Sequence, residues 1–179
     1  MRYALMLAFL TMAPDAKAHL MSPGHGTLNL VNSKVYVVVS LPVSVFMKSA
    51  AAPAAADGVL TAHELNTFGT ALRRCIRDRL LIHHNERSVQ FSSLLLNLPQ
   101  GDHHEPGRSR SVTVMGVAPI DGTSRSGPIE VTTKLWGIAA NRLKLKATIT
   151  QAGKTVRTEI FEFTPRADRH RFFATPRLK

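Results

Sequence analysis

The chain has 179 residues, of which 44% are hydrophobic. Its 23 Lys and Arg residues exceed its 12 Asp and Glu residues, which gives a net charge of +11 with neutral histidines. This length and composition suit one domain with a buried core and exclude a fibrous chain, while the single cysteine, Cys75, excludes an intramolecular disulfide. The basic residues are scattered with few aromatic residues between them, so the charge favours an anionic partner and does not indicate nucleic acid.

Residues 1–18 have the pattern of a signal peptide. Arg2 supplies positive charge, "ALMLAFLTM" supplies an apolar segment, and "AKA" ending at Ala18 supplies a cleavage site. The apolar segment is about half of the ~20 residues that cross a bilayer, and Pro14 interrupts it. We therefore predict a periplasmic or secreted protein that begins at His19 and is not transmembrane. Loss of two basic residues and one acid with the leader leaves 21 basic and 11 acidic residues, a net charge of +10.

Two strand-like segments follow, "TLNLV" at 27–31 and "VYVVVSLPVSVF" at 35–46. The short polar "NSK" between them predicts a hairpin. Both alternating faces of the second segment are largely apolar, which indicates a strand at the centre of a sheet.

A connector of low complexity at 48–56, "KSAAAPAAA", precedes the clearest helical pattern in the chain. This pattern predicts a helix over about 62–79, with one apolar stripe and several arginines on the opposite side. The stripe consists of Leu65, Phe68, Leu72, Cys75, Ile76 and Leu80. We expect the Cys75 thiol to be an inert part of the core and not a nucleophile.

From residue 80 onward the apolar pattern changes to alternation, which predicts six further strands at 80–84, 88–98, 111–118, 129–137, 143–150 and 155–163. About eight strands and one helix predict a mainly β fold of the α+β kind, either an antiparallel β-sandwich or an open barrel with one inserted amphipathic helix. The domain would span 19–164. Residues 165–179 would form a basic C-terminal tail, in which Phe172 and Phe173 either dock on the domain or belong to a surface-contact arm.

The segment "ADGVLTAHEL" has the second half of an EF-hand calcium loop. With Gly58 at the sixth position, Asp57 lies at the fifth, Val59 at the seventh, Thr61 at the ninth and Glu64 at the twelfth. These positions supply the side-chain and backbone oxygens of such a loop. The segment is therefore a candidate calcium site.

The first half of the calcium pattern is missing, because Pro53 and Ala55 stand where the first two side-chain ligands belong. Such a site would bind calcium only in the millimolar range or more weakly. Thr61 and Glu64 also form a T-x-x-E capping box, and Asp57 with its following glycine forms an ordinary turn. This second interpretation explains the residues without a metal, and we favour it over calcium binding.

The stretches "AHLMSPGHGTLNLV", "SLPVSVF" and "ADGVLTAHEL" resemble a group of small exported bacterial proteins of unknown function that carry a single EF-hand-like loop. The resemblance covers most of the mature chain. It implies an exported β-rich domain with a calcium loop, and it implies no catalytic residues. The departures at Pro53 and Ala55 remove two of the implied ligands.

Eight histidines suggest a second metal hypothesis, since neutral imidazole suits copper, nickel and zinc. The candidate ligands are the mature N-terminal residue, a residue close behind it and a loop pair: His19, His25, His103 and His104. The neighbours His83 and His84 lie on a predicted strand and would point to opposite faces, so they would not share an ion.

The sequence contains no nucleophile elbow, phosphate loop or dinucleotide motif. We therefore predict an exported, non-enzymatic binding or accessory module whose partner is an anionic surface or another periplasmic protein, without a required cofactor. The alternative is a periplasmic copper- or nickel-binding protein that uses His19 and the loop histidines. A third possibility is an oxidative metalloenzyme built on the same N-terminal histidine.

Overall fold

The computed structural model of the protein describes residues 21–47, 57–99, 107–120, 127–137 and 141–174. The signal peptide at 1–18, His19, His103, His104, and the positions of Pro53 and Ala55 lie outside the described residues. In chain order the elements are β1 His25–Val31, β2 Lys34–Pro42, η1 Val43–Val45, β3 Leu60–Thr61, α1 Ala62–Arg79, β4 Leu80–His84, β5 Arg87–Val89, β6 Ser93–Asn97, β7 Arg108–Ser109, β8 Ser111–Pro119, β9 Ile129–Thr133, β10 Leu143–Gln151, β11 Lys154–Phe163 and β12 Arg169–Phe172.

The largest element is a six-stranded sheet in the order β11-β10-β1-β2-β8-β6. The predicted hairpins are confirmed, since β1 pairs antiparallel with β2 and β10 pairs antiparallel with β11. The predicted central position of β2 is also confirmed. One pairing departs from the antiparallel prediction: β1 runs parallel to β10, from His25 opposite Lys144 to Val31 opposite Thr150. These strands are distant in sequence, so no hairpin turn dictates their direction.

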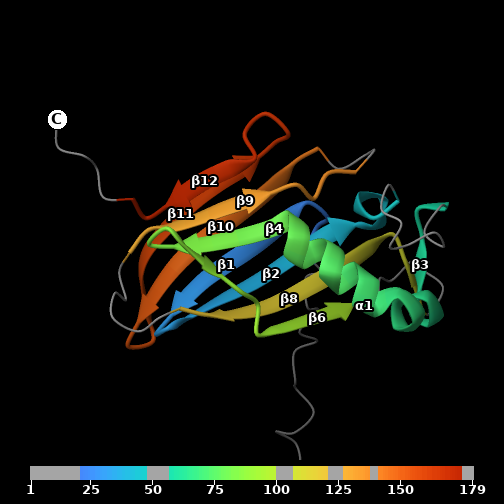
Figure 1. Cartoon of the computed structure of the whole chain (residues 1–179), viewed down its shortest axis with the longest axis horizontal. Helices are drawn as coiled ribbons and strands as arrows, with labels where there is room; N and C mark the ends of the chain where they lie inside the picture. The colour runs from blue at the N-terminus through green and yellow to red at the C-terminus, as the bar shows by residue number, and fades with distance from the viewer. Residues whose placement is uncertain (1–20, 48–56, 100–106, 121–126, 138–140, 175–179) are drawn as a thin grey trace, which may run out of the picture.

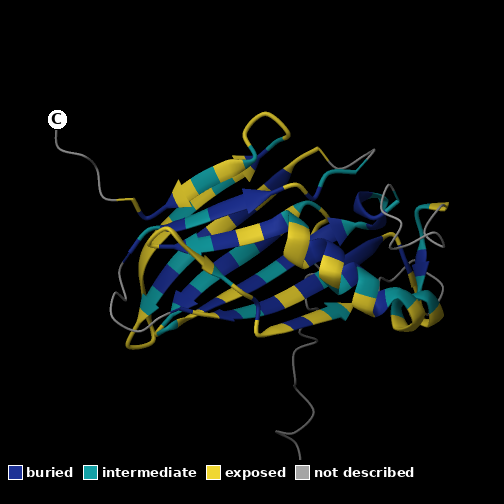
Figure 2. Ribbon diagram, in the orientation of Figure 1, coloured by how far each residue is buried: buried dark blue, intermediate teal, exposed yellow. Residues whose placement is uncertain are grey.

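A second layer covers one face of this sheet and makes the fold a mainly β sandwich with one inserted helix. The layer consists of α1 and a four-stranded sheet in the order β12-β9-β4-β5 (Figure 1). Buried and exposed positions alternate along the strands, as Figure 2 shows. The side chains buried between the layers form one hydrophobic cluster that draws on both sheets and on α1.

The helix α1 follows β2, as predicted, and its bounds match the predicted 62–79. Leu72, Cys75 and Ile76 are buried, while Arg74 and Arg77 are exposed on the other side. The apolar stripe therefore faces the sheet, and α1 contacts β6, β4 and β3. Among the helices of the described residues, none combines the length and apolar content that crossing a bilayer requires.

The strands predicted over 35–46 and 129–137 are shorter than expected, the second because β9 ends at Thr133. The strand predicted over 35–46 ends at Pro42, and a 3-10 turn brings Val43, Val45 and Phe46 into the core. Proline has no N–H to donate, and the Val43 N–H makes the last hydrogen bond in the β2–β8 register, to the Arg110 carbonyl at 2.8 Å. The alternating pattern does not distinguish these apolar residues of a turn from those of a strand.

The strand predicted over 88–98 is two strands, β5 and β6, that belong to different sheets. Between them Phe91 turns inward, and a Cβ placed on Gly116 would lie 2.6 Å from its ring. The chain crosses between the layers at this point, because burial of Phe91 is worth more than continued pairing. This crossing carries β6 to one edge of the large sheet.

The domain boundary predicted at 164 is too early. Residues 169–172 form β12, which pairs antiparallel with β9, and both Phe172 and Phe173 are buried. Of the two alternatives for these phenylalanines, docking on the domain is the one observed. The short "RHRF" pattern has a single strongly apolar residue, so only its pairing partner makes it a strand.

Candidate functional site

The described half of the calcium-like loop forms the entrance of α1. The Glu64 carboxylate accepts hydrogen bonds from the Thr61 backbone N–H at 2.7 Å and from the Thr61 hydroxyl at 2.8 Å. In return, the Thr61 hydroxyl oxygen accepts from the Glu64 N–H at 3.1 Å. This is the complete capping box that the sequence predicts.

The residues before the cap form the predicted turn. The Asp57 carboxylate accepts from the Val59 N–H at 2.9 Å, and Gly58 has a φ of +76°, a left-handed conformation that glycine tolerates. The other Asp57 oxygen lies 3.9 Å from the Arg108 guanidinium. The structure thus brings Asp57, Val59, Thr61 and Glu64 together, but their hydrogen bonds serve the helix entrance. A calcium ion would have to compete with the capping box for Glu64 and with Arg108 for Asp57.

His25 lies beside cations. It is exposed at the start of β1, opposite Lys144, and lines a hollow of about 440 Å³ that Arg142 and Glu162 also line. Arg142 and Glu162 form an ion pair at 3.5 Å. Positive neighbours raise the cost of binding a metal dication at His25. Within the described residues, no three His, Cys, Asp or Glu side chains are grouped closely enough to share a metal ion.

The two strand histidines differ in burial. His84 shares the inner face of β4 with Leu80 and Ile82 and is 5% exposed, whereas His83 is intermediate. Burial lowers the pKa of His84. One ring nitrogen of each histidine is buried without a hydrogen-bond partner among the described residues. Since successive strand residues face opposite sides, the two rings do not converge on one site.

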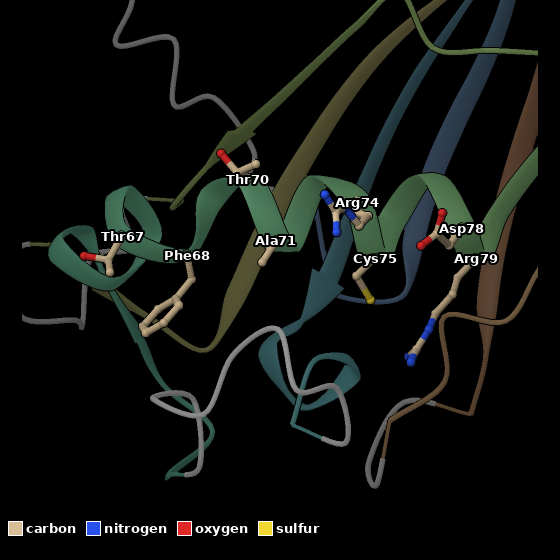
Figure 3. Close-up of a pocket in the computed structure, with 8 residues that line it drawn as sticks. All are labelled: Thr67, Phe68, Thr70, Ala71, Arg74, Cys75, Asp78 and Arg79. Atoms are coloured by element: carbon tan, nitrogen blue, oxygen red, sulfur yellow. The ribbon is translucent and has the colours of Figure 1, made fainter.

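A second hollow, of about 500 Å³, runs along the side of α1 (Figure 3). Phe68, Ala71 and Cys75 give it an apolar wall, and Arg74 and Arg79 also line it. Cys75 is 6% exposed and belongs to the hydrophobic cluster, as expected for a core residue. This burial suits a structural cysteine, and we assign no chemistry to this hollow.

The sheet face turned away from the second layer is a further surface of the described residues. The strand registers place its side chains in rows that cross all six strands. The central row runs from edge to edge as Leu95, Met115, Val38, Thr27, Lys146 and Ile160. The next row runs as Ser93, Val117, Tyr36, Asn29, Thr148 and Thr158. On the other side of the central row lie Asn97, Thr113, Ser40, His25, Lys144 and Glu162.

One half of this outer face is apolar. Tyr36 and Met115 are each 37% exposed and Leu95 is 59% exposed, and the register places Met115 between Leu95 and Val38. We call these four residues the apolar patch. Exposed apolar side chains that are contiguous mark interaction surfaces more often than scattered ones do.

Three lysines lie on the same outer face as the apolar patch. Lys144 and Lys146 lie on β10, and Lys34 starts β2 on the same face as Tyr36. We call these lysines the lysine border. Sequence reasoning missed this surface, although the alternation of lysines in "LKLKATIT" placed two of them on one face. The strand order that brings them beside the apolar patch cannot be read from the alternation.

Comparison of this chain with models of known protein families finds no match, and no curated protein matches it either.

Proposed function

We propose that this protein is an exported binding module without catalytic activity, and that it attaches to an anionic membrane surface through the outer face of its six-stranded sheet. The observation that carries the proposal is the apolar patch beside the lysine border on one sheet face. Apolar side chains gain free energy on leaving water, and lysines gain by lying close to anionic headgroups. The net positive charge of the mature chain acts in the same direction.

The kind of cation favours a lipid surface over a protein partner. Protein interfaces are enriched in arginine and depleted in lysine, whereas the cations across the outer rows are lysines. A lysine also extends a flexible stem that keeps its ammonium group at headgroup level while neighbouring apolar groups enter the interface. Glu162, the carboxylate in these rows, is neutralised by its ion pair with Arg142.

The residues described supply no support for a metal-dependent activity. His25, the described member of the histidine hypothesis, lies beside Lys144 and Arg142, and the carboxylates of the calcium-like loop are held by the helix entrance. These contacts suit a structural role, so binding by a surface is the function that the geometry supports best.

Co-sedimentation with vesicles tests the proposal. Wild-type protein should bind vesicles that contain phosphatidylglycerol, should not bind vesicles of phosphatidylcholine alone, and should bind less at high salt because screening weakens surface electrostatics. The double variant Lys144→Ala, Lys146→Ala should bind about thirtyfold more weakly, from roughly 1 kcal/mol per lysine. The variant Leu95→Asp should also lose binding.

The matched control removes the same charge from the other layer. Arg74→Ala, Arg77→Ala takes two exposed cations from α1, which covers the inner face of the sheet. This control should retain binding within about threefold, the remaining effect coming from net charge alone. Equal losses in the lysine and arginine variants would show that no particular face binds and would refute the proposal.

A further inference from the structure

Among the described residues, the strand β6 has no pairing partner on one edge of the large sheet. It hydrogen-bonds with β8 on one side and is the last strand of the sheet on the other (Figure 1). Its sequence, "SLLLN", contains no charged residue and no proline. Proteins usually block an exposed edge with charges, prolines or bulges, because unpaired backbone groups there accept another strand.

The opposite edge carries the usual protection. β11 contains Lys154, Arg157, Glu159 and Glu162, and its pairing with β10 has a register shift beside Ile149. Charges and irregular pairing both hinder the addition of a strand. The two edges of the same sheet are therefore built differently, and β6 is the one suited to pairing.

The sequence of β6 is complementary to itself when it is reversed. In an antiparallel pair of two β6 strands centred on Leu95, Leu95 lies opposite Leu95, Leu94 opposite Leu96, and Ser93 opposite Asn97. The leucines meet leucines and the small polar residues meet each other, with no charge left opposite an apolar group. A two-fold axis requires this kind of self-complementary surface.

We propose that a second copy of this chain pairs with β6 in this register and joins the two sheets edge to edge. A second copy fits better than a strand of another protein, because β6 offers no charged residue with which to select an acidic or basic strand. Leu95, which is 59% exposed in one copy, becomes covered by its equivalent. The inference does not depend on membrane binding, although pairing places the two apolar patches side by side on one continuous face.

The charge of the protein gives this dimer a distinctive response to salt. Two copies with a net charge of +10 repel each other, so screening should strengthen the dimer. Binding to anionic lipid should weaken under the same change. Failure of one proposal is therefore distinguishable from failure of the other.

Sedimentation velocity over a concentration series, on the chain purified after export and without lipid, tests the pairing. We expect a monomer–dimer equilibrium that tightens with salt. Leu95→Lys should weaken the dimer by about tenfold or more, because two like charges then face each other. Ile160→Lys is the matched control: Ile160 is also 59% exposed, lies in the same cross-sheet row, and belongs to the opposite edge. It should change the dimer less than about twofold.

Mixing tests the register itself. Leu95→Lys alone and Leu95→Glu alone should each be monomeric, and an equal mixture should form a heterodimer, because only self-pairing at Leu95 places the two new charges opposite each other. Circular dichroism should show that both variants keep the wild-type fold, since Leu95 is mainly exposed. A wild-type monomer at high salt, an equal loss with Ile160→Lys, or no rescue in the mixture would each overturn the proposal.

Discussion

The two edges of the six-stranded sheet are held in different ways. At the β11 edge the layers meet through rings: Phe161 stacks on His170 with centroids 3.9 Å apart, and Phe163 lies 6.2 Å from Phe172. At the β6 edge, Phe91 packs over Gly116 and α1 lies against the strand. All ring-to-ring contacts in the described parts of the chain belong to the β11 side. An aromatic cluster thus closes the space between the layers at the β11 edge, which we call the closed edge, and the ring contacts among the described residues do not extend to β6.

The C-terminal residues complete the closed edge. The Phe173 N–H donates to the Glu159 carboxylate at 3.0 Å, and the Arg157 guanidinium lies 5.5 Å from the centre of the Phe173 ring. Arg157 and Glu159 form an ion pair at 2.7 Å. A segment that follows the last long strand in sequence therefore contacts Arg157 and Glu159 of that strand in space.

The largest expected effect on the free energy of unfolding comes from removing an aromatic ring at the closed edge. Phe163→Ala should reduce the free energy of unfolding by about 3–5 kcal/mol, since Phe163 is fully buried and contacts several rings. Phe91→Ala should cost less, because ring pairs add about 0.5–1.5 kcal/mol beyond buried area. Urea unfolding of both variants measures the difference. Equal losses would mean that the aromatic cluster does not distinguish the two edges.

A smaller effect is expected from Gly116→Ala on the β6 side. The added methyl group would lie 2.6 Å from the Phe91 ring and force it to move, at a cost of about 1–3 kcal/mol. In a chain that already carries Phe91→Ala, Gly116→Ala should hardly change the free energy of unfolding. A double-mutant cycle by urea unfolding measures this coupling, and additive effects would rule out the contact as the cause.

Loss of the N-cap of α1 should reduce the free energy of unfolding by about 1 kcal/mol, and the effect should appear on the β6 side of the fold. Thr61→Ala removes the hydroxyl that accepts from the Glu64 N–H, and loss of such a cap typically costs this much. Because α1 packs against β6, amide exchange in β6 should accelerate more than in β11. Thr61→Ser, which keeps the hydroxyl, should restore both measurements. Faster exchange in β11 instead would contradict the expected coupling.

The smallest expected effect is the pH dependence of the stability that His170 contributes at the closed edge. Burial lowers the pKa of His170 below its ordinary 6.5, although Glu159 opposes this shift. The unfolded chain therefore binds more protons below pH 6.5, so His170 contributes stability above this pH that is lost as the pH falls. The variant His170→Phe should show a smaller fall in melting temperature between neutral and mildly acidic pH than wild type. His84, whose pKa is also lowered, remains in both proteins and supplies the residual slope. An unchanged slope would exclude His170 as a source.

Much of the local structure could be predicted from the sequence, because each pattern depended on near neighbours. Helix α1 was predicted from the spacing of residues such as Leu72 and Ile76, and its start from the T-x-x-E of Thr61 and Glu64. The β10–β11 hairpin followed from alternation on both sides of "QAGK". The turn at Asp57 and the capping box of Glu64 were also predicted from near neighbours, whereas the cations beside His25 depend on the folded chain.

The sequence by itself determined the mainly β class, the single helix with its cap, and the alternating faces of the long strands, since these depend on hydrophobic periodicity over a few residues. Tertiary structure alone decided the parallel β1–β10 pair, the inclusion of β12 in a sheet, and the position of β6 at an open edge. The physical reason is that strand order is chosen by burial and pairing between distant segments, which leave no local pattern. The apolar patch and the lysine border are neighbours on the outer face because that order brings the lysines of β10 within two strands of Val38 on β2.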